Sequence, residues 1–580
     1  MSTTPPARGI SRGLTNYGDA GFAAYLRRSF IKSMGYTNEA LAKPVVGIAS
    51  TPSGFNNCHR AMPELVEAVK RGVLMAGGLP IEFPSMSLGE VFLAPTSLMF
   101  RNLMSMVTEE MITAQPMDSV VLIGGCDKTV PAQLMGAASA NLPAIQVVTG
   151  PMMTGRHQGE RLGACTDCRR FWAQYRAGKV SDQEIVQIES SLATTAGTCA
   201  VMGTASTMAC LAEALGMMLP GTAAIPSVHA DRLRAAERSG ALAVALIDKP
   251  IRPSDILTPK AFENALRVLL AIGGSTNAII HLTAIAGRMG HRIDLQTLNR
   301  LSDTTPVLVD LKPTGQGYME DFFAAGGMSA VLAQLKPLLH LDALTITGET
   351  LGQRLAAEAQ AAVWSDAKMI RPLNDPIDPQ GGLVALHGSL APEGAILKRS
   401  AADANLFETE GRAVVFSDLD DLARRIDDPA LDIQPNDFMV LQNAGPTSPS
   451  GMPEAGYLPI PRKLARAGVK DMVRISDGRM SGTAFGTIVL HVTPEAAVGG
   501  ALKTARQNVQ KLLGAEHDHE IVFTSGGTEA VTRVLIESRD LDTGERWFTV
   551  GVSPNIIDAS FEALLDSAST TLTKPDSLTS

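Results

Sequence analysis

The sequence predicts an α/β protein with two domains, and three observations support this fold class. Over the first two thirds of the chain, short apolar runs alternate with amphipathic segments, which is typical of parallel strands joined by helices. After about Asn374, short β-rich runs follow one another, separated by Gly, Pro and Asp turns. The chain of 580 residues is 45% hydrophobic, which is sufficient for more than one core. We therefore expect an N-terminal α/β domain with a mostly parallel sheet over residues 1–373 and a β-rich C-terminal domain over residues 374–580.

The N-terminal elements are expected in strand–helix order. Apolar runs that end at small or turn residues predict strands over 43–51, 118–125 and 144–151. Helices are expected over 61–78 and 204–220, because apolar side chains recur there at three- and four-residue spacing along one face. Parallel strands bring the loops at their carboxyl ends to one edge of the sheet, so a site is expected at that edge.

The C-terminal elements are expected to be strands in close succession. The β-rich runs lie at 381–388, 411–418, 437–446, 471–478, 486–494, 519–527 and 546–551. Their short length and the turn residues between them are typical of a barrel or a sandwich.

Composition excludes several classes of protein. The formal net charge of −9 argues against a general attraction to nucleic acid or anionic lipid. The N-terminal segment MSTTPPARGISRGLTNYG lacks the apolar centre of a secretory signal, and no apolar run approaches the roughly 18 residues of a membrane helix. Six cysteines are too few for a disulfide scaffold, so we expect a cytoplasmic protein whose thiols are free, catalytic or metal-bound.

Three cysteines share one context. Cys58 and Cys126 each follow a predicted strand, and Cys199 lies in a Gly/Thr-rich loop that leads into a helix. Thiols brought to one sheet edge could converge on a metal centre, and a helix N-terminus favours thiolates there. Their spacing matches neither a ferredoxin run nor a zinc finger, so three buried thiols that pack as small hydrophobic residues stay an open alternative.

Two further cysteines, Cys165 and Cys168, form a C-x-x-C. A structural zinc site would need two more ligands, and no second C-x-x-C exists. We therefore expect both to be ordinary surface or core thiols. A zinc hydrolase is also disfavoured, because the ten histidines do not supply a recognisable His/Glu ligand set.

Carboxylates form a second group of candidate residues. Glu90 lies in a turn beside an apolar stretch, Asp127 directly follows Cys126, and Glu454 ends a loop that is too rich in Gly and Pro to be a helix face. Hard carboxylate oxygens suit Mg²⁺, which takes few protein ligands. The alternative for each single carboxylate is a solvated surface charge.

A Gly-rich loop around Ser481 is the third candidate. Ser481 is flanked by Gly478, Gly482 and Gly486 just after a predicted strand, and small neighbours allow a substrate to approach its hydroxyl. It is not the G-x-S-x-G elbow of hydrolases, because residue 479 is Arg. An ordinary Gly-rich turn is the alternative. The chain also lacks the G-x-G-x-x-G and P-loop patterns of dinucleotide and nucleotide binding.

Five motifs in order resemble the dihydroxy-acid and sugar-acid dehydratase family. They are GGCDKTVPA, GTCAVMGTAST, GGSTNA, GMPEAG and DGRMSGTAFG. The resemblance spans roughly residues 40 to 560, and several long motifs in one order are far more specific than any of them alone.

The resemblance implies two cofactors and their ligands. An iron–sulfur cluster would be held by Cys58, Cys126 and Cys199, and is [2Fe-2S] in similar sugar-acid enzymes, with [4Fe-4S] as the alternative. Mg²⁺ would be held by residues that map to Glu90, Asp127, Lys128 and Glu454. Lys128 would act as a carbamate, because an ammonium cannot ligate a cation.

The resemblance also implies a mechanism and an architecture. A 2,3-dihydroxy acid would lose water to give a 2-oxo-3-deoxy acid, with Ser481 as an alkoxide base and the two metal centres as Lewis acids. A C-terminal β-barrel domain flanked by helices is implied, as are homodimers or homotetramers. Two departures from the family pattern occur, at Ser450 before the GMPE motif and in the residues around Cys58.

The substrate is expected to be a sugar acid. The segment RMSGTAFGTIVLHVTPEAAVGG is similar to enzymes that act on aldonates such as arabinonate or xylonate. The alternative is 2,3-dihydroxyisovalerate dehydration in branched-chain amino-acid synthesis, since pocket residues outside the motifs decide specificity. A more remote alternative is a catalytically idle metal-binding homologue, which the presence of every expected ligand position and of Ser481 argues against.

Overall fold

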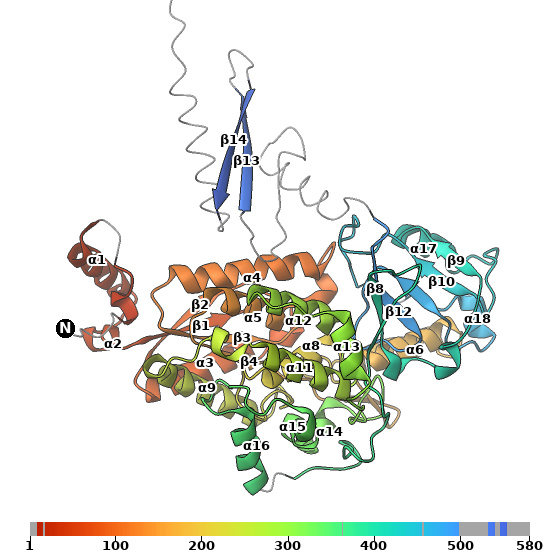
Figure 1. The fold of residues 1–580 in the computed structure, drawn as a ribbon, viewed down its shortest axis with the longest axis horizontal. Helices are drawn as coiled ribbons and strands as arrows, with labels where there is room; N and C mark the ends of the chain where they lie inside the picture. Colours follow the sequence, from red (N-terminus) through yellow and green to blue (C-terminus); the bar gives the residue numbers. More distant parts are fainter. Residues whose placement is uncertain are drawn as a thin grey trace, which may run out of the picture.

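The computed structural model describes residues 8–14, 18–361, 364–454 and 458–497, and the backbone of two strands over 532–539 and 546–553. Two sheets organise this part of the chain (Figure 1). A large hydrophobic core surrounds the first sheet, and a smaller core lies within the C-terminal part. Leu383, Ala385 and Ile396 pack into the larger core, so the beginning of the C-terminal sheet is anchored on the N-terminal part.

The N-terminal sheet has four parallel strands in the order β2-β1-β3-β4. Their bounds are β1 Val45–Ser50, β2 Leu79–Pro84, β3 Ser119–Gly124 and β4 Ala144–Val148. In the register of the sheet, Val46 of β1 lies between Pro80 and Ser119 of its two neighbours. The predicted parallel sheet and its three expected strands are therefore confirmed, and β2 is an additional edge strand.

Helices cover both faces of this sheet (Figure 1). On one face, α3 (Met62–Met75) and α9 (Ala230–Asp248) pack against the strands and against each other. Gly72 and Gly240 lie at their crossing, where an added Cβ would collide with the backbone of the opposite helix. On the other face lie α4 (Ser97–Ala114) and α5 (Thr129–Ala140).

The N-terminal part contains further helices and strands. They are α1 Ala20–Lys32, α2 Asn38–Leu41, β5 Gly155–His157, β6 Glu160–Leu162, α6 Thr166–Arg176, α7 Asp182–Leu192, α8 Thr204–Ala214, α10 Pro253–Ile256, α11 Pro259–Ala271, α12 Asn277–Arg288, α13 Leu295–Ser302, α14 Met319–Ala324, α15 Gly327–Leu335 and α16 Leu351–Gln360. Of these, β6, α6 and α7 form a small core of their own. The helix expected over 204–220 is α8, which ends at Ala214, with Gly216 in the left-handed region beyond it (φ 88°).

The C-terminal sheet has six strands in the order β7-β8-β12-β11-β10-β9. Their bounds are β7 Val384–Leu386, β8 Gly394–Leu397, β9 Ala413–Phe416, β10 Phe438–Leu441, β11 Arg474–Ser476 and β12 Ile488–Thr493. Strands β9 to β12 are parallel, whereas β8 is antiparallel to β12 and β7 to β8. The sheet is thus mixed.

The expected β-barrel is not found in the part of the chain that the structure describes. The six-stranded sheet is open, with β7 and β9 at its edges. Two short helices, α17 (Leu419–Arg425) and α18 (Arg462–Arg466), lie in the connections between its parallel strands. Short apolar runs in the sequence do not predict these helices. The expected run over 546–551 lies in β14 (Arg546–Ser553), which pairs with β13 (Thr532–Arg539) as a separate hairpin. The run over 519–527 lies outside the described residues.

Within the described ranges, no helix combines the length and the apolar character needed to cross a membrane.

Candidate active site

The first part of the site is the turn between β3 and α5, which carries Cys126, Asp127 and Lys128. Gly125 opens this turn, where an added Cβ would collide with the Thr149 side chain. The turn is at the carboxyl end of a buried parallel strand, as expected for a ligand site in such a sheet.

His59 joins this turn to the loop that carries Cys58. The backbone N–H groups of Gly125 and Cys126 donate to Nε2 of His59 at 3.0 and 3.1 Å. Nδ1 lies 2.8 Å from the carbonyl oxygen of Thr51, so the hydrogen bonds assign the proton to Nδ1 and make Nε2 the acceptor. Burial lowers the pKa of His59 to about 4, which keeps the ring neutral in this role.

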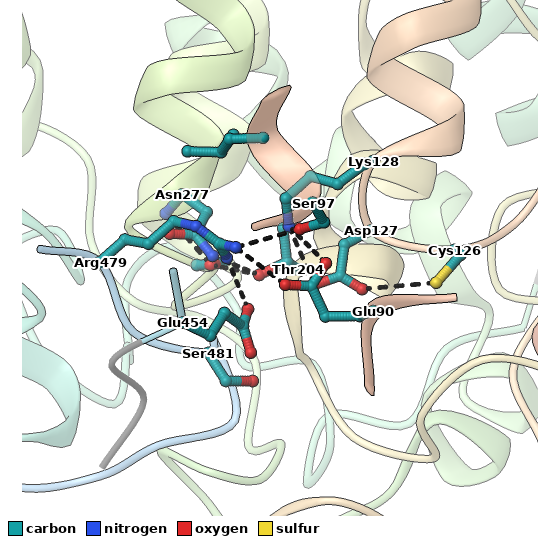
Figure 2. A network of polar contacts seen from close by, with 12 residues as sticks. Glu90, Ser97, Cys126, Asp127, Lys128, Thr204, Asn277, Glu454, Arg479 and Ser481 are labelled. Atoms are coloured by element: carbon teal, nitrogen blue, oxygen red, sulfur yellow. Dashed lines mark hydrogen bonds and ion pairs between the residues drawn. The ribbon is translucent and has the colours of Figure 1, made fainter. Parts of the chain in front are cut away.

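Arg479 is the centre of the polar network (Figure 2). Its Nη2 donates to Glu90 Oε1 at 2.8 Å and its Nη1 donates to Glu454 Oε1 at 2.9 Å. Nε donates to the carbonyl of Met452 at 2.9 Å, and Nη2 also reaches Ser97 Oγ at 3.1 Å. Because the Arg479 side chain is fully buried, these acceptors satisfy a charge that has no access to water.

Lys128 is a second buried cation beside the same carboxylates. Its Nζ lies 3.3 Å from Glu90 Oε2 and 3.4 Å from Asp127 Oδ2. Burial would raise the pKa of Glu90, but the charges of Lys128 and Arg479 outweigh it and lower that pKa to about 2. Burial prevails at Glu454, whose pKa rises to about 7 although Arg479 is adjacent.

The Ser481 loop follows β11 and faces this network from the C-terminal part (Figure 2). Ser481 Oγ lies 2.9 Å from Thr483 Oγ1. Gly482 between them packs against Ser275, and an added Cβ there would collide with that side chain. The carbonyl of Gly482 accepts a 3.2 Å hydrogen bond from Nζ of Lys398.

Lys398 has no carboxylate partner among the residues that the structure describes. The side chain follows β8 and is buried, and burial alone lowers its pKa to about 7. A buried amine without a counter-ion lowers the stability of the fold. Its position beside the Ser481 loop therefore indicates a role in the site.

The thiols gather at the edge of the carboxylate network. A hydrogen bond with the Cys58 thiol, and then burial, raises the pKa of Cys126. The sulfur atoms of Cys165 and Cys199 lie 3.3 Å apart, and this contact, followed by burial, raises the pKa of Cys199. The charge of Cys58 acts in the same direction on the pKa of Cys199.

The donor chemistry fits the two implied cofactors. No three His, Cys, Asp or Glu side chains of the described residues stand ready as a metal site, because Arg479 and Lys128 already pair with the carboxylates. Oε2 of Glu90 is nevertheless buried and accepts no hydrogen bond. This oxygen has the Lys128 amine 3.3 Å away, and a hard oxygen beside further carboxylates is suited to Mg²⁺. The thiols of Cys58 and Cys199, which are half-buried, and of Cys126, which is buried, are suited to iron.

Several residues of the site were not predicted from the sequence. Arg479 lies inside the DGRMSG motif. A charged residue in a Gly-rich loop directly after a buried strand is the feature of the sequence that could have pointed to it. His59 and Thr483 each stand one or two positions from a predicted residue. Cys165, expected to be an ordinary surface or core thiol, contacts Cys199.

The fold and the site define an α/β enzyme in which loops from two domains share one polar centre. Family models assign the class: the N-terminal model of the dihydroxy-acid/6-phosphogluconate dehydratases matches residues 43–354, and the C-terminal model of that family matches 368–509. The chain belongs to the dihydroxy-acid/6-phosphogluconate dehydratase family. This confirms the resemblance that the motifs indicated and makes the protein a dehydratase, which is a hydro-lyase.

Individual relatives come from both branches of the family. The chain is 46% identical over 493 residues to L-arabinonate dehydratase from Rhizobium leguminosarum bv. trifolii, covering 84% of each chain. It is 46% identical over 510 residues to L-arabonate dehydratase from Azospirillum brasilense, covering 87% of this chain and 86% of the relative. A dihydroxy-acid dehydratase from Acetivibrio thermocellus is 39% identical over 487 residues, covering 83% of this chain and 86% of the relative.

A third family model matches a shorter stretch. The class-V aminotransferase model matches residues 491–550, overlapping the end of the dehydratase match. The matched stretch is about a tenth of the chain, so it does not by itself place the protein in that family.

Proposed function

We propose that this enzyme dehydrates an aldonate, a sugar acid with hydroxyl groups on C2 and C3, to the 2-oxo-3-deoxy acid. The relatives named for arabinonate or arabonate are 46% identical, whereas those named dihydroxy-acid dehydratase are 39–40% identical. A relative named for 6-deoxy-6-sulfo-D-gluconate, from Pseudomonas putida, is 43% identical. Sugar acids are therefore favoured over 2,3-dihydroxyisovalerate.

One observation carries the proposal: side chains distant in sequence form a single acidic centre with Ser481 beside it. Glu90 comes from the N-terminal domain and Glu454 from the C-terminal domain, and Arg479 hydrogen-bonds to both. Such a centre requires both domains to be in place.

The cofactor assignment rests on the family resemblance, and the donor types present are compatible with it. Glu90, Asp127, Glu454 and Lys128 as a carbamate would hold Mg²⁺, and Cys58, Cys126 and Cys199 would hold a [2Fe-2S] cluster. When bound, the two centres supply Lewis acidity for the carboxylate and 2-hydroxyl and for the departing 3-hydroxyl. The family resemblance also supports a homodimer or homotetramer.

The chain itself supplies the base. Ser481 would take the C2 proton as an alkoxide, and the Thr483 hydroxyl at 2.9 Å can donate a hydrogen bond to that oxygen and favour its anionic form. The Lys398 amine, one carbonyl group away, fixes the loop through Gly482, and in its protonated form it adds positive charge near the loop. Gly482 packs so closely against Ser275 that a side chain at this position would displace the loop.

A substrate panel tests the proposal. The protein is purified anaerobically, supplied with Mg²⁺ and assayed for 2-oxo acid formation from pentonates, hexonates, glycerate-type acids and 2,3-dihydroxyisovalerate. We expect turnover of aldonates and little turnover of dihydroxyisovalerate. Preference for dihydroxyisovalerate would contradict the sugar-acid assignment, and failure to turn over any acid with iron, sulfide and Mg²⁺ present would favour an idle homologue.

A further inference from the structure

The Cys165–Cys199 contact joins a cysteine outside the ligand set that the family resemblance implies to one inside it. Cys165 precedes α6, on the segment that links the β5–β6 hairpin to that helix, and Cys199 lies in the loop before α8. Their sulfur atoms are 3.3 Å apart, although the residues are 34 positions apart in sequence. Both residues are half-buried.

The backbone fixes this pair from both sides. The amide of Ala200 donates to the carbonyl of Ala164 at 2.9 Å, which places the 164–165 and 199–200 peptides side by side. On the far side of Cys165, the Asp167 carboxylate accepts hydrogen bonds from the Gly163 amide at 2.8 Å and from Tyr318 at 2.9 Å. The contact of the two sulfur atoms is therefore held by the fold.

We propose that Cys165 and Cys199 are a covalent modification site: in the protein without its cluster they form a reversible disulfide, which withdraws one of the three thiols expected to hold the cluster. The ligand role of Cys199 rests on the proposed function, whereas the disulfide itself rests on the contact alone. The sulfur atoms need to approach by about 1.3 Å to reach bonding distance.

A peroxide is the oxidant that the chemistry requires. Attack of one thiolate on hydrogen peroxide breaks the O–O bond and forms a sulfenic acid, and the remaining oxygen leaves as water after protonation. The second sulfur then attacks the sulfenic sulfur, the S–O bond breaks, the S–S bond forms, and a second water leaves. Two thiols are oxidised by two electrons in total and one peroxide is reduced to two waters. A dithiol reductant reverses the reaction by thiol–disulfide exchange.

Cys168 could compete with Cys199 for a disulfide with Cys165. Its thiol donates to the backbone carbonyl of Cys165 at 2.6 Å, and a C-x-x-C can close on itself. A Cys165–Cys168 bond would leave Cys199 free for the cluster. The identity of the linked pair therefore decides the proposal.

The test uses the full-length chain before cluster reconstitution. The reduced protein is treated with hydrogen peroxide, its remaining thiols are alkylated, and linked peptides are identified by mass spectrometry. We expect the wild type to lose two alkylatable thiols as a Cys165–Cys199 peptide pair and Cys165→Ser to lose none. Cys210→Ser is the matched control, since Cys210 is buried within α8, and it should respond as the wild type does. A cross-link between any other pair, or loss of two thiols in Cys165→Ser, would overturn the proposal.

Iron uptake provides a second measurement. During reconstitution with ferrous iron and sulfide, the peroxide-treated wild type should take up several-fold less iron than the reduced protein, and dithiothreitol should restore uptake. Cys165→Ser should take up the same amount of iron before and after peroxide. Undiminished iron uptake by the cross-linked wild type would overturn the claim that a cluster thiol is withdrawn. Neither measurement uses a substrate, so an absence of dehydratase turnover would not affect it.

Discussion

Arg479 donates a 2.8 Å hydrogen bond to Glu90, a residue 389 positions earlier in the chain. The same guanidinium bonds Glu454 at 2.9 Å, so one buried cation joins carboxylates from both domains. These carboxylates are also two of the proposed Mg²⁺ ligands. Arg479 thus holds them close together while neutralising part of their charge.

Replacement of Arg479 by Met should destabilise the protein strongly. The change leaves Glu90 and Glu454 buried with one cation fewer, and removal of one partner of a buried ion pair typically costs about 3–5 kcal/mol. The free energy of unfolding from urea titration measures the effect. Arg412→Met is the control, because Arg412 is half exposed in its pairs with Asp432 and Asp437 and its loss should change the free energy of unfolding much less. Equal stability of the two variants would contradict the role given to Arg479.

Replacement of Ser481 by Ala should abolish most of the activity without loss of cofactors. Removal of a general base typically lowers kcat by about 10²- to 10⁴-fold. Thr483→Val should have a smaller effect and Thr483→Ser almost none, because the serine keeps the hydroxyl that contacts Ser481. The measurements are kcat, the visible absorption of the cluster and the Mg²⁺ content. A Ser481→Ala enzyme with near-full activity would refute the base assignment.

Lys398→Met should make the protein more stable and less active. Burial lowers the pKa of Lys398 to about 7, so between pH 7 and its unfolded value of 10.5 the unfolded chain binds the extra proton and stability rises with pH. Met removes this penalty, and we expect a gain of about 1–3 kcal/mol at pH 7. The kcat should fall by about tenfold or more, because the serine loop loses its anchor and a nearby charge. Thermal melting and kcat measured on one preparation test both effects, and a variant that is less stable but fully active would contradict the prediction.

The protein without its cluster should lose stability as the pH falls from 6.5 to 4, partly through His59. The unfolded chain takes up a proton on this ring near pH 6.5, whereas burial lowers the pKa of folded His59 to about 4. Protons therefore favour the unfolded chain between these values, by about 3 kcal/mol at the acid end.

His281 and His491 are also buried with lowered pKa values, so the His59 contribution is isolated by comparison with His59→Gln. The variant should show a shallower dependence of the unfolding free energy on pH between 6.5 and 4. Parallel curves for the two proteins would show that His59 is not the group responsible.

The sequence predicted the parts of this molecule that depend on local pattern. Buried parallel strands are continuous apolar runs, so β1, β3 and β4 were found, together with the turn after β3 that carries Asp127. Strand β2 was missed because Pro80, Glu82 and Pro84 interrupt its apolar character, which an edge strand tolerates.

The parts that were missed depend on contacts between distant segments. The role of Arg479 depends on its hydrogen bonds to Glu90 and Glu454. No sequence pattern relates Arg479 to Glu90, because the two residues are 389 positions apart. The open form of the C-terminal sheet depends on short helices in its connections, whose few residues carry too little periodicity to be recognised. The five motifs predict the family because they occur together in one order, whereas the spacing of their residues alone does not identify it.

The most direct test of sugar-acid dehydration is the product formed from L-arabinonate in D₂O, followed by NMR with the anaerobically purified, Mg²⁺-supplied protein. The account predicts a 2-oxo-3-deoxy pentonate that carries a single deuterium from solvent at C3, because the enol formed after loss of water is protonated there. Unchanged L-arabinonate, or an oxidised product with no loss of the 3-hydroxyl, would contradict it.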